Sequence, residues 1–291
     1  MSRPETFIPA YSIKTKEMRP QGFDILNLSA SGNREYDSSH LHRHTFYELF
    51  YFYGGEGRHE IDFREYRVEG SSIHFVSPGQ IHKLVLKRGN GFVICFTEDL
   101  VQLRQRETIA EKFPFYDNSN SPVLALSKEL AGELGFLIES VARELRLRHG
   151  DTELFRSYLS VILLRLRSEY ITSATNRGLQ LLKNKKVIAF RNLINEHFLD
   201  HWSVSEYASR LNLSPNHLNA LCKKNEGRSA ITLVHERLLL EARRLLFATD
   251  LHVKEISYAL NFEDISYFNR FFKNHSGLTP NAFRDQFSKN R

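Results

Sequence analysis

A sequence repeat near the C-terminus constrains the fold more than any other feature of the chain. One copy runs from Ser214 to Gly227 and the second from Asp264 to Gly277, with apolar residues at matching positions 50 residues apart. The segments before the two copies also match, at a spacing of 49 residues. A supersecondary unit that occurs twice in this way indicates two helix–turn–helix units in one all-helical domain.

Each copy carries signals for where its helix begins and which face it buries. Ser214 and Asp264 suit the N-cap position, and Pro215 suits the first helical turn. Apolar residues then recur at i, i+3 and i+4, so each helix buries one face and exposes the opposite one. Asn212 and Asn261 fall in the preceding turns, where we expect a positive φ that asparagine tolerates.

The exposed faces of both helices carry side chains that suit DNA. Amides can recognise adenine, Arg can recognise guanine, and Lys or Ser can contact phosphates. The predicted DNA-binding residues are Ser214, Asn216, His217, Asn219, Ala220, Lys223 and Lys224 in the first copy and Ile265, Ser266, Tyr267, Asn269, Arg270 and Lys273 in the second. We expect Asn219 and Arg270 to recognise bases and Lys273 to contact a phosphate. The alternative, two ordinary amphipathic hairpins, does not explain why repeat, cap, turn and exposed chemistry agree twice.

The charge distribution points to the same part of the chain. The 17 basic and 11 acidic residues from Gln180 onward account for the whole net charge of +6, so the preceding residues carry no net charge. We therefore expect a polyanion such as double-stranded DNA to bind the C-terminal part and not the N-terminal part.

A longer stretch around the second copy resembles the signature of the AraC/XylS transcription regulators. The resemblance covers the chain from Lys186 to Asn290. The residues that carry it are Ile256 to Lys273, Gly277-Leu278-Thr279-Pro280 and Phe283-Arg284.

Two residues depart from the family pattern: Asn261 stands where Gly is usual, and Cys222 where Phe is usual. The resemblance implies a DNA-binding domain over residues 185–291, with helix–turn–helix units at 203–224 and 252–274 that enter two successive major grooves. It also implies promoter DNA, RNA polymerase and a small-molecule effector as partners, with activation as the commoner outcome.

Between residues 23 and 126 the pattern changes to short apolar runs separated by turn residues. Many short strands at close spacing predict a small β-barrel or sandwich. The predicted strands are Asp24–Leu28, Thr45–Tyr53, Gly57–Phe63, Arg64–Val68, Ser72–Val76, His82–Lys87 and Gly91–Phe96, with turns at Gly54-Gly55, Gly70, Pro78-Gly79 and Gly89-Asn90-Gly91. Residues 1–22 show no clear periodicity and are predicted to form an N-terminal arm.

One group of polar side chains is predicted to lie inside this barrel. On a strand, His42, His44, Phe46 and Glu48 share a face, and His82 can complete the group. We predict that these five residues bind a small-molecule effector, either sugar-like or aromatic.

The same group resembles the metal-binding pattern of the cupin family. His42, His44, Glu48 and His82 form a donor set that can hold Fe, Mn, Ni or Zn. The sensory domains of AraC-type regulators look like cupins and often lack metal, so we expect neither a metal cofactor nor a catalytic residue. One alternative is a metal-dependent cupin enzyme fused to a DNA-binding module. Another is a DNA binder without a ligand, which leaves the pocket unexplained.

The sequence assigns no specific functional role to four further residues whose side chains can bind metal or undergo redox chemistry. His74 is expected at a surface or structural position, and His59 either in the pocket or as a plain strand residue. Cys95 and Cys222 are each alone in an apolar setting, so we expect core residues and no disulfide.

The apolar period becomes helical over residues 127–171. Two helices are expected there, one that ends near His149-Gly150 and one that Asp151 caps. In the family such a pair commonly forms the dimer contact, so we predict that this segment makes the protein a homodimer. The small polar residues from Thr172 to Gly178 predict a linker over residues 172–184.

The expected fold class is α+β in several domains: an N-terminal cupin-like β-barrel with two helices, then a C-terminal all-α domain with two helix–turn–helix units. No apolar run reaches 18 residues, so no transmembrane helix and no membrane partner are expected. The first residues lack the apolar core of a signal peptide, which predicts a cytoplasmic protein.

Overall fold

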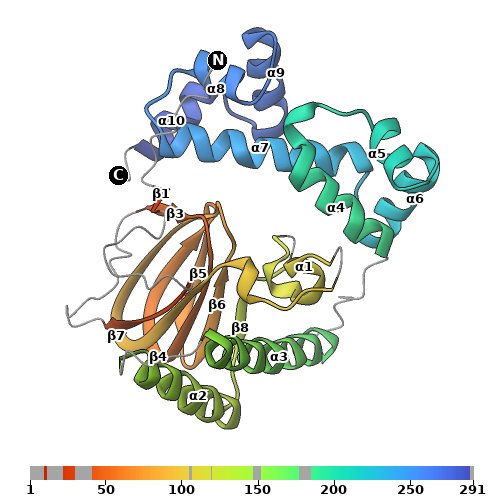
Figure 1. Cartoon of the computed structure of the whole chain (residues 1–291). Helices are drawn as coiled ribbons and strands as arrows, with labels where there is room; N and C mark the ends of the chain where they lie inside the picture. Colours follow the sequence, from red (N-terminus) through yellow and green to blue (C-terminus); the bar gives the residue numbers. More distant parts are fainter. Residues whose placement is uncertain are drawn as a thin grey trace. The chain divides into compact units, whose positions relative to one another are not determined.

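In the computed structural model the chain forms two compact units (Figure 1). One comprises Pro9–Leu181, and the other is built on Leu182–Arg291. The structure describes residues 10–11, 22–29, 41–104, 107–118, 120–146, 152–176 and 185–288. Most of the predicted N-terminal arm therefore lies outside the described residues.

The first unit contains an eight-stranded sheet. Its strands are β1 (Ala10–Tyr11), β2 (Phe23–Ser29), β3 (His42–His44), β4 (Tyr47–Ile61), β5 (Arg64–Glu69), β6 (Ser72–Val76), β7 (Ile81–Phe96) and β8 (Val123–Ala125). They follow the order β1-β3-β7-β4-β6-β8, with β2 also paired to β7 and β5 to β4. Every pair is antiparallel except β1 with β3. The predicted cupin-like antiparallel architecture is confirmed.

The two longest strands correct two of the predicted turns. β4 and β7 each continue through glycines that had indicated a turn, and these glycines face each other, with Gly55 opposite Gly89. A Cβ on Gly55 would lie 2.7 Å from the Arg88 carbonyl oxygen, and one on Gly91 would lie 2.0 Å from that of Tyr51. The glycines therefore let two paired backbones approach closely at a bulge, and they end neither strand.

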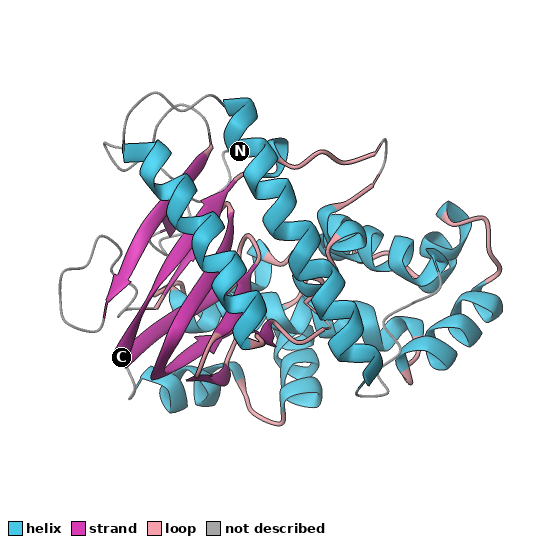
Figure 2. Cartoon of the chain, turned by 90° about the horizontal axis from the view of Figure 1, so that it is seen from below, coloured by secondary structure: helices cyan, strands magenta, loops and turns pink. Residues whose placement is uncertain are grey.

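Helices cover one face of the sheet (Figure 2). The α-helices of this unit are α1 (Ile109–Lys112), α2 (Lys128–Arg146) and α3 (Thr152–Asn176), and single 3₁₀ turns lie at Glu98–Leu100 and Pro114–Tyr116. The apolar stripes of α2 and α3 pack against strand residues such as Leu49 and Tyr51. Their neighbours Phe50 and Phe52 point to the opposite face and line the barrel interior.

α3 is longer than the sequence predicted. It continues to Asn176, so the first residues of the predicted linker are helical. The reason is that Ala174 is buried one turn after the buried Tyr170, which extends the packed stripe. The predicted cap Asp151 and the rest of the linker lie outside the described residues.

The second unit is all-helical, as predicted. Its elements are α4 (Lys185–His197), a 3₁₀ turn (Phe198–Asp200), α5 (Val204–Arg210), α6 (Pro215–Glu226), α7 (Ala230–Ala248), α8 (Val253–Ala259), α9 (Ile265–Ser276) and α10 (Pro280–Ser288). α5 with α6 and α8 with α9 form the two helix–turn–helix units, and α7 connects them. None of the described helices is long and apolar enough to span a membrane.

Side-chain hydrogen bonds join the second helix–turn–helix unit to the 3₁₀ turn that precedes the first. Asn261, in the turn before α9, donates from its Nδ2 to the Leu199 carbonyl oxygen at 3.1 Å. His201 Nε2 lies 2.9 Å from the Leu260 carbonyl oxygen. The Asn that stands where the family usually has Gly therefore keeps the required positive φ, here 60°, and adds a contact that Gly cannot make.

Candidate nucleic-acid interface and ligand-binding barrel

The helices α6 and α9 are fixed at both ends. Ser214 accepts a hydrogen bond from the His217 backbone N–H at 3.2 Å, and Asp264 accepts one from that of Ser266 at 2.7 Å. At their C-termini, Gly227 and Gly277 adopt the left-handed conformation that ends a helix. The predicted caps are confirmed, as is the positive φ of Asn212 and Asn261 in the preceding turns.

Each of these helices buries one face and exposes the other. Leu218 and Cys222 of α6 are buried, as are Phe268, Phe271 and Phe272 of α9. Eleven of the thirteen predicted DNA-binding residues are exposed, and the two that are partly buried are Asn219 and Ile265. The interface is thus presented by two helix faces of similar construction.

The cations on these faces differ from those elsewhere in the unit. They are Lys223, Lys224, Arg270 and Lys273. Within the described part of the chain, none of the four side chains forms a hydrogen bond or an ion pair. In contrast, Arg228 lies 2.6 Å from Glu236, and Arg191 lies 2.7 Å from Glu226. Carboxylates of the same unit therefore hold Arg228 and Arg191, whereas the four cations on the faces are available to phosphates or bases.

Asn219 departs from its predicted place on the exposed face. It is half-buried, and its Oδ1 accepts a hydrogen bond of 2.9 Å from the backbone N–H of Ala230. That N–H is one of the donors that the first turn of α7 leaves without a helical partner. The Asn219 amide therefore helps to cap α7, and Asn216, exposed one turn earlier, is better placed for DNA.

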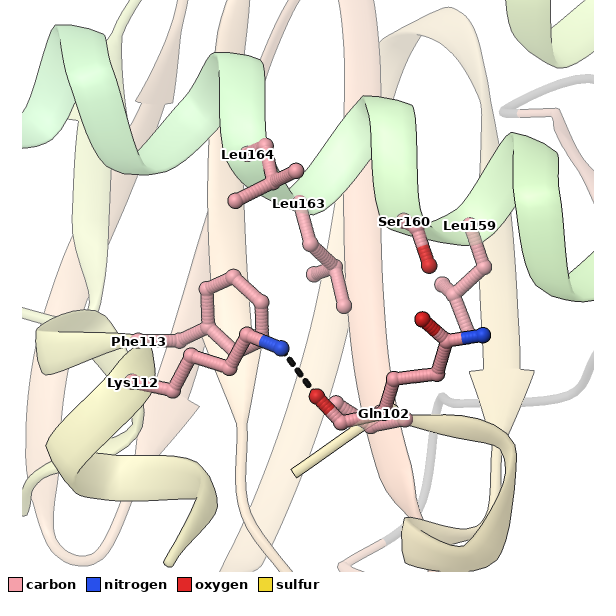
Figure 3. Close-up of a pocket in the computed structure, with 8 residues that line it drawn as sticks. Gln102, Lys112, Phe113, Leu159, Ser160, Leu163 and Leu164 are labelled. Carbon is pink, nitrogen blue, oxygen red and sulfur yellow. Dashed lines mark hydrogen bonds between the residues drawn. The ribbon is translucent and has the colours of Figure 1, made fainter. Parts of the chain in front are cut away.

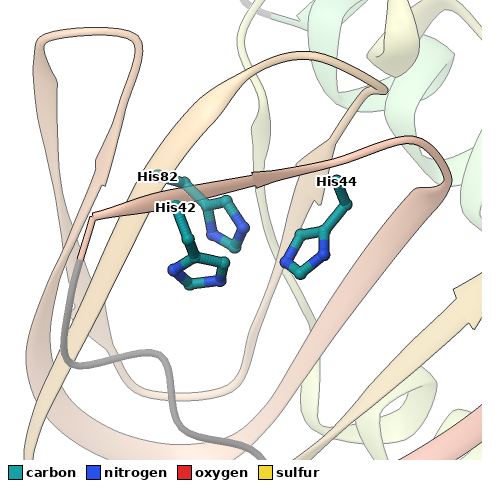
Figure 4. Close-up of side chains that lie close together, drawn as sticks. All are labelled: His42, His44 and His82. Atoms are coloured by element: carbon teal, nitrogen blue, oxygen red, sulfur yellow. The ribbon is translucent and has the colours of Figure 1, made fainter. Parts of the chain in front are cut away.

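In the barrel, the predicted histidines come together (Figure 4). The ligand nitrogens of His42, His44 and His82 all lie within 4.8 Å of one another. Glu48 places Oε2 3.0 Å from His82 Nε2 and Oε1 3.3 Å from His44 Nε2. The Phe46 ring lies 4.4 Å from that of His44, and all five side chains are buried.

The backbone brings Glu48 to this group by a route that differs from the predicted single strand. β3 ends at His44, a bend follows at Thr45 and Phe46, and β4 begins at Tyr47. Alternation along one strand therefore does not place the group. It is placed by the pairing of β3 and β4 with the same long strand, β7.

Two members of the buried cluster were not identified from the sequence. His74 was expected at a surface or structural position and His59 was left undecided, yet both are fully buried, His59 beside His82 and His74 beside His59. His59 Nε2 lies 3.2 Å from His82 Nδ1, and His59 Nδ1 lies 3.1 Å from His74 Nδ1. The bulges of β4 change which residues face inward, so alternation could not reveal His59.

Burial controls the protonation of these imidazoles. It lowers the pKa of both His74 and His82 to about 3. The pKa of His59 falls well below its usual value, mainly through burial and further through the neighbouring imidazoles. The three rings are therefore neutral at pH 7, and each keeps one nitrogen lone pair that can accept a hydrogen bond or coordinate a metal ion.

The donor set fits a divalent transition-metal ion. Three imidazoles and one carboxylate converge, and these are ligands that Fe, Mn, Ni or Zn accept. His82 Nε2 and Glu48 Oε2 are 3.0 Å apart, which is close enough for both atoms to bind one cation.

A further hollow lies outside the barrel, against α3 (Figure 3). It has a volume of about 70 Å³ and is lined by Phe113, Leu159, Leu163 and Leu164, with the Lys112 ammonium donating to the Gln102 carbonyl oxygen at its edge. A hollow of this size holds water or an ion but not a monosaccharide, so it is not a candidate effector site.

Two protein-family models match the chain. The AraC-like ligand binding domain matches residues 28–159, and the helix-turn-helix domain matches residues 207–286. The first range contains the buried histidine cluster and the second contains α6 and α9.

Three curated relatives are similar to this chain over different shares of its length. The HTH-type transcriptional regulator YfiF of Bacillus subtilis is 24% identical over 86% of this chain and 80% of its own length. The HTH-type transcriptional activator RhaR of Enterobacter sp. is 23% identical over 85% of this chain and 88% of its own length. The regulatory protein PocR of Salmonella typhimurium is 32% identical over only 37% of this chain and 35% of its own length.

Proposed function

Because this chain belongs to the AraC/XylS family of transcriptional regulators, we propose that it is a sequence-specific transcriptional activator controlled by an effector in its N-terminal barrel. Regulators of this family bind DNA and small-molecule effectors. Activation is the finer part of the proposal, and its support is that the relative RhaR is named an activator.

One observation carries the DNA-binding part. Two helices of similar construction, each capped at both ends, present exposed cations that no acidic side chain of the described residues neutralises. Cations held in this way are ready to replace the counterions of DNA phosphates. We infer that α6 and α9 enter two successive major grooves, with Asn216 and Arg270 towards base edges and Lys223 and Lys273 towards phosphates.

Selection of DNA from a randomised library by the full chain tests this inference. The two-groove model predicts two preferred sequence elements about one helical turn, or roughly 10 base pairs, apart. Arg64→Ala, which removes an exposed cation from the barrel, should select the same sequences. Recovery of a single short element, or of no preferred sequence, would contradict the model.

The effector and the assembly are further parts of the proposal. We infer a sugar-like or aromatic effector that contacts the group of His42, His44, Phe46, Glu48 and His82, because these side chains combine hydrogen-bonding groups with aromatic faces. A divalent ion held there would supply a Lewis acid that anchors an oxygen of the effector. A screen of sugars, sugar acids and aromatic acids for a rise in melting temperature tests the effector class, and a flat response to all three contradicts it.

We infer a homodimer that contacts RNA polymerase in the cytoplasm. The support for the dimer is a set of large apolar side chains exposed on the outer faces of α2 and α3, namely Phe136, Val161 and Leu164, which are 73%, 46% and 47% exposed. Equilibrium sedimentation of Leu164→Asp compared with wild type tests it. A monomeric wild-type protein at micromolar concentration would remove this part of the proposal and leave the DNA-binding part standing.

We infer regulation and not catalysis for the barrel. The full-length relatives are named as transcriptional regulators. A cupin enzyme fused to a DNA-binding module remains the alternative that turnover of a candidate substrate by metal-loaded protein would support.

A further inference from the structure

A row of three buried imidazoles extends from the group of His42, His44 and Glu48 into the barrel interior. His82 contacts His59, and His59 contacts His74, through ring nitrogens 3.2 and 3.1 Å apart. At one end of the row, His82 Nε2 faces Glu48. At the other end, His74 Nε2 has no hydrogen-bond partner among the described residues.

The row allows only two arrangements of its protons. His59 and His74 are fully buried and contact no carboxylate among the described residues, so both are neutral imidazoles. A neutral imidazole has one N–H donor and one acceptor nitrogen. Each of the two contacts needs one donor and one acceptor, so fixing the tautomer of one ring fixes the other two.

In the first arrangement, His74 donates to His59, His59 donates to His82, and the remaining proton of His82 is on Nε2 towards Glu48. In the second arrangement every ring is the opposite tautomer. His82 donates from Nδ1 to His59, His59 donates from Nδ1 to His74, and Nε2 of His82 keeps a lone pair. Passing from the first arrangement to the second removes the proton from His82 Nε2 and adds one to His74 Nε2. The three rings together therefore carry three N–H protons in both arrangements.

We propose that His59 and His74 are positioning residues: when a divalent transition-metal ion binds, His59 accepts a hydrogen bond from His82 Nδ1 and His74 accepts one from His59, so that the Nε2 lone pair of His82 joins His42, His44 and Glu48 as a metal ligand. Ligand histidines in metal sites commonly donate their second ring N–H to an acceptor that fixes the ring orientation and raises ligand basicity. In this barrel the acceptor is the neutral imidazole of His59, which in turn donates to His74.

A purely structural role explains the row less well. Burying two imidazoles costs free energy that an apolar pair in the same space would avoid. The Nε2 atom of His74 lacks a hydrogen-bond partner among the described residues in either arrangement, so the row does not satisfy its own polar atoms. What the row provides is an acceptor for the Nδ1 proton of His82, which leaves His82 Nε2 able to bind a metal ion. This inference concerns the barrel and adds to the proposed DNA-binding function without depending on it.

Nitrogen NMR of the full chain labelled with ¹⁵N-histidine tests the tautomer directly, before and after one equivalent of Zn²⁺. The expected result is that zinc binds once per chain and moves the His59 proton from Nε2 to Nδ1, with His82 protonated on Nδ1. Failure of zinc to bind would overturn the proposal. So would zinc binding that leaves the His59 tautomer unchanged. Because this measurement uses the wild-type protein, it does not depend on the folding of a variant.

Zinc affinity of variants, measured by competition with a chelating dye, tests the positioning role. His59→Phe should weaken zinc binding by roughly 10- to 100-fold, the range for loss of an outer partner of a ligand histidine. His59→Gln keeps a carbonyl oxygen that can accept from His82 and should restore most of the affinity. Phe50→Leu, which alters a ring 4.7 Å from that of His59, is the matched packing control and should bind zinc as wild type does. Equal affinity in His59→Phe and wild type would overturn the proposal, as would equal losses in His59→Phe and Phe50→Leu.

Discussion

At the scale of single residues, two cations on one face of α9 have different expected roles. Arg270 lies in the middle of the helix, where a guanidinium can bind a guanine through two hydrogen bonds, whereas Lys273 lies in the last turn. Arg270→Ala should relax base preference at one position, with a loss of about 1–3 kcal/mol of discrimination. Lys273→Ala should weaken binding to all sequences alike and reduce the salt slope by roughly one unit.

Binding to a randomised-site library at two salt concentrations separates these roles. Arg64→Ala in the barrel is the control for loss of one exposed positive charge outside the interface. If Arg270→Ala and Lys273→Ala change binding in the same way, the assignment of base recognition to Arg270 and phosphate contact to Lys273 is wrong.

Asn219 illustrates why exposure could not be read from helical spacing alone. The spacing placed it on the exposed face, but the N-terminus of α7 packs close enough to use its carbonyl oxygen. Asn219→Ala should therefore cost about 1 kcal/mol of unfolding free energy and leave base preference unchanged. Asn219→Asp keeps an acceptor oxygen and should lose less. Urea unfolding measures the first effect and library selection the second; altered base preference in Asn219→Ala would restore the original prediction.

At the scale of elements, glycine has opposite consequences in the long strands and in the helices. A Cβ on Gly91 in β7 would lie 2.0 Å from a backbone oxygen of β4, whereas one on Gly132 in α2 would meet nothing within 4 Å. Gly91→Ala should destabilise the barrel by about 1–3 kcal/mol, the usual cost of overpacking. Gly132→Ala should stabilise it by about 0.5–1 kcal/mol, because alanine favours a helix. Urea unfolding of both variants checks the signs, and a stable Gly91→Ala protein would show that β4 and β7 can separate.

The elements that the sequence predicted well are those whose signals are local. The N-caps Ser214 and Asp264 and the turn residues Asn212 and Asn261 act on neighbouring backbone, so their roles follow from the sequence itself. The continuity of a strand through glycines could not be predicted from local signals. Whether a glycine ends a strand or bends it depends on the partner strand, which lies tens of residues away.

The candidate site in the barrel could also be predicted only in part. The short spacings that join His42, His44 and Glu48 suggested that they would converge, and the structure brings them together with His82. His59 and His74 join them only because β4 contains bulges and pairs with both β6 and β7. That arrangement is a property of the folded sheet, so no local pattern indicates it.

At the scale of the whole molecule, the two compact units predict separable functions. The net charge of +6 and both recognition helices belong to residues 180–291, so this fragment should bind DNA by itself in a salt-dependent way. Its affinity should be lower than that of the full chain if the barrel unit dimerises. Titration of labelled DNA with fragment and full chain measures both effects. A folded fragment that does not bind DNA at low salt would contradict the assignment.

The two cysteines provide an internal probe of this division. The sequence contains two, and the structure places Cys95 in the core of the barrel and Cys222 in the core of the helical unit, both as buried free thiols. A buried thiol reacts with an alkylating reagent only when its surroundings open. Labelling kinetics followed by mass spectrometry would thus report two opening free energies from one unmodified protein, one for each unit. Binding of DNA should slow only the labelling of Cys222, and binding of an effector in the barrel should slow that of Cys95.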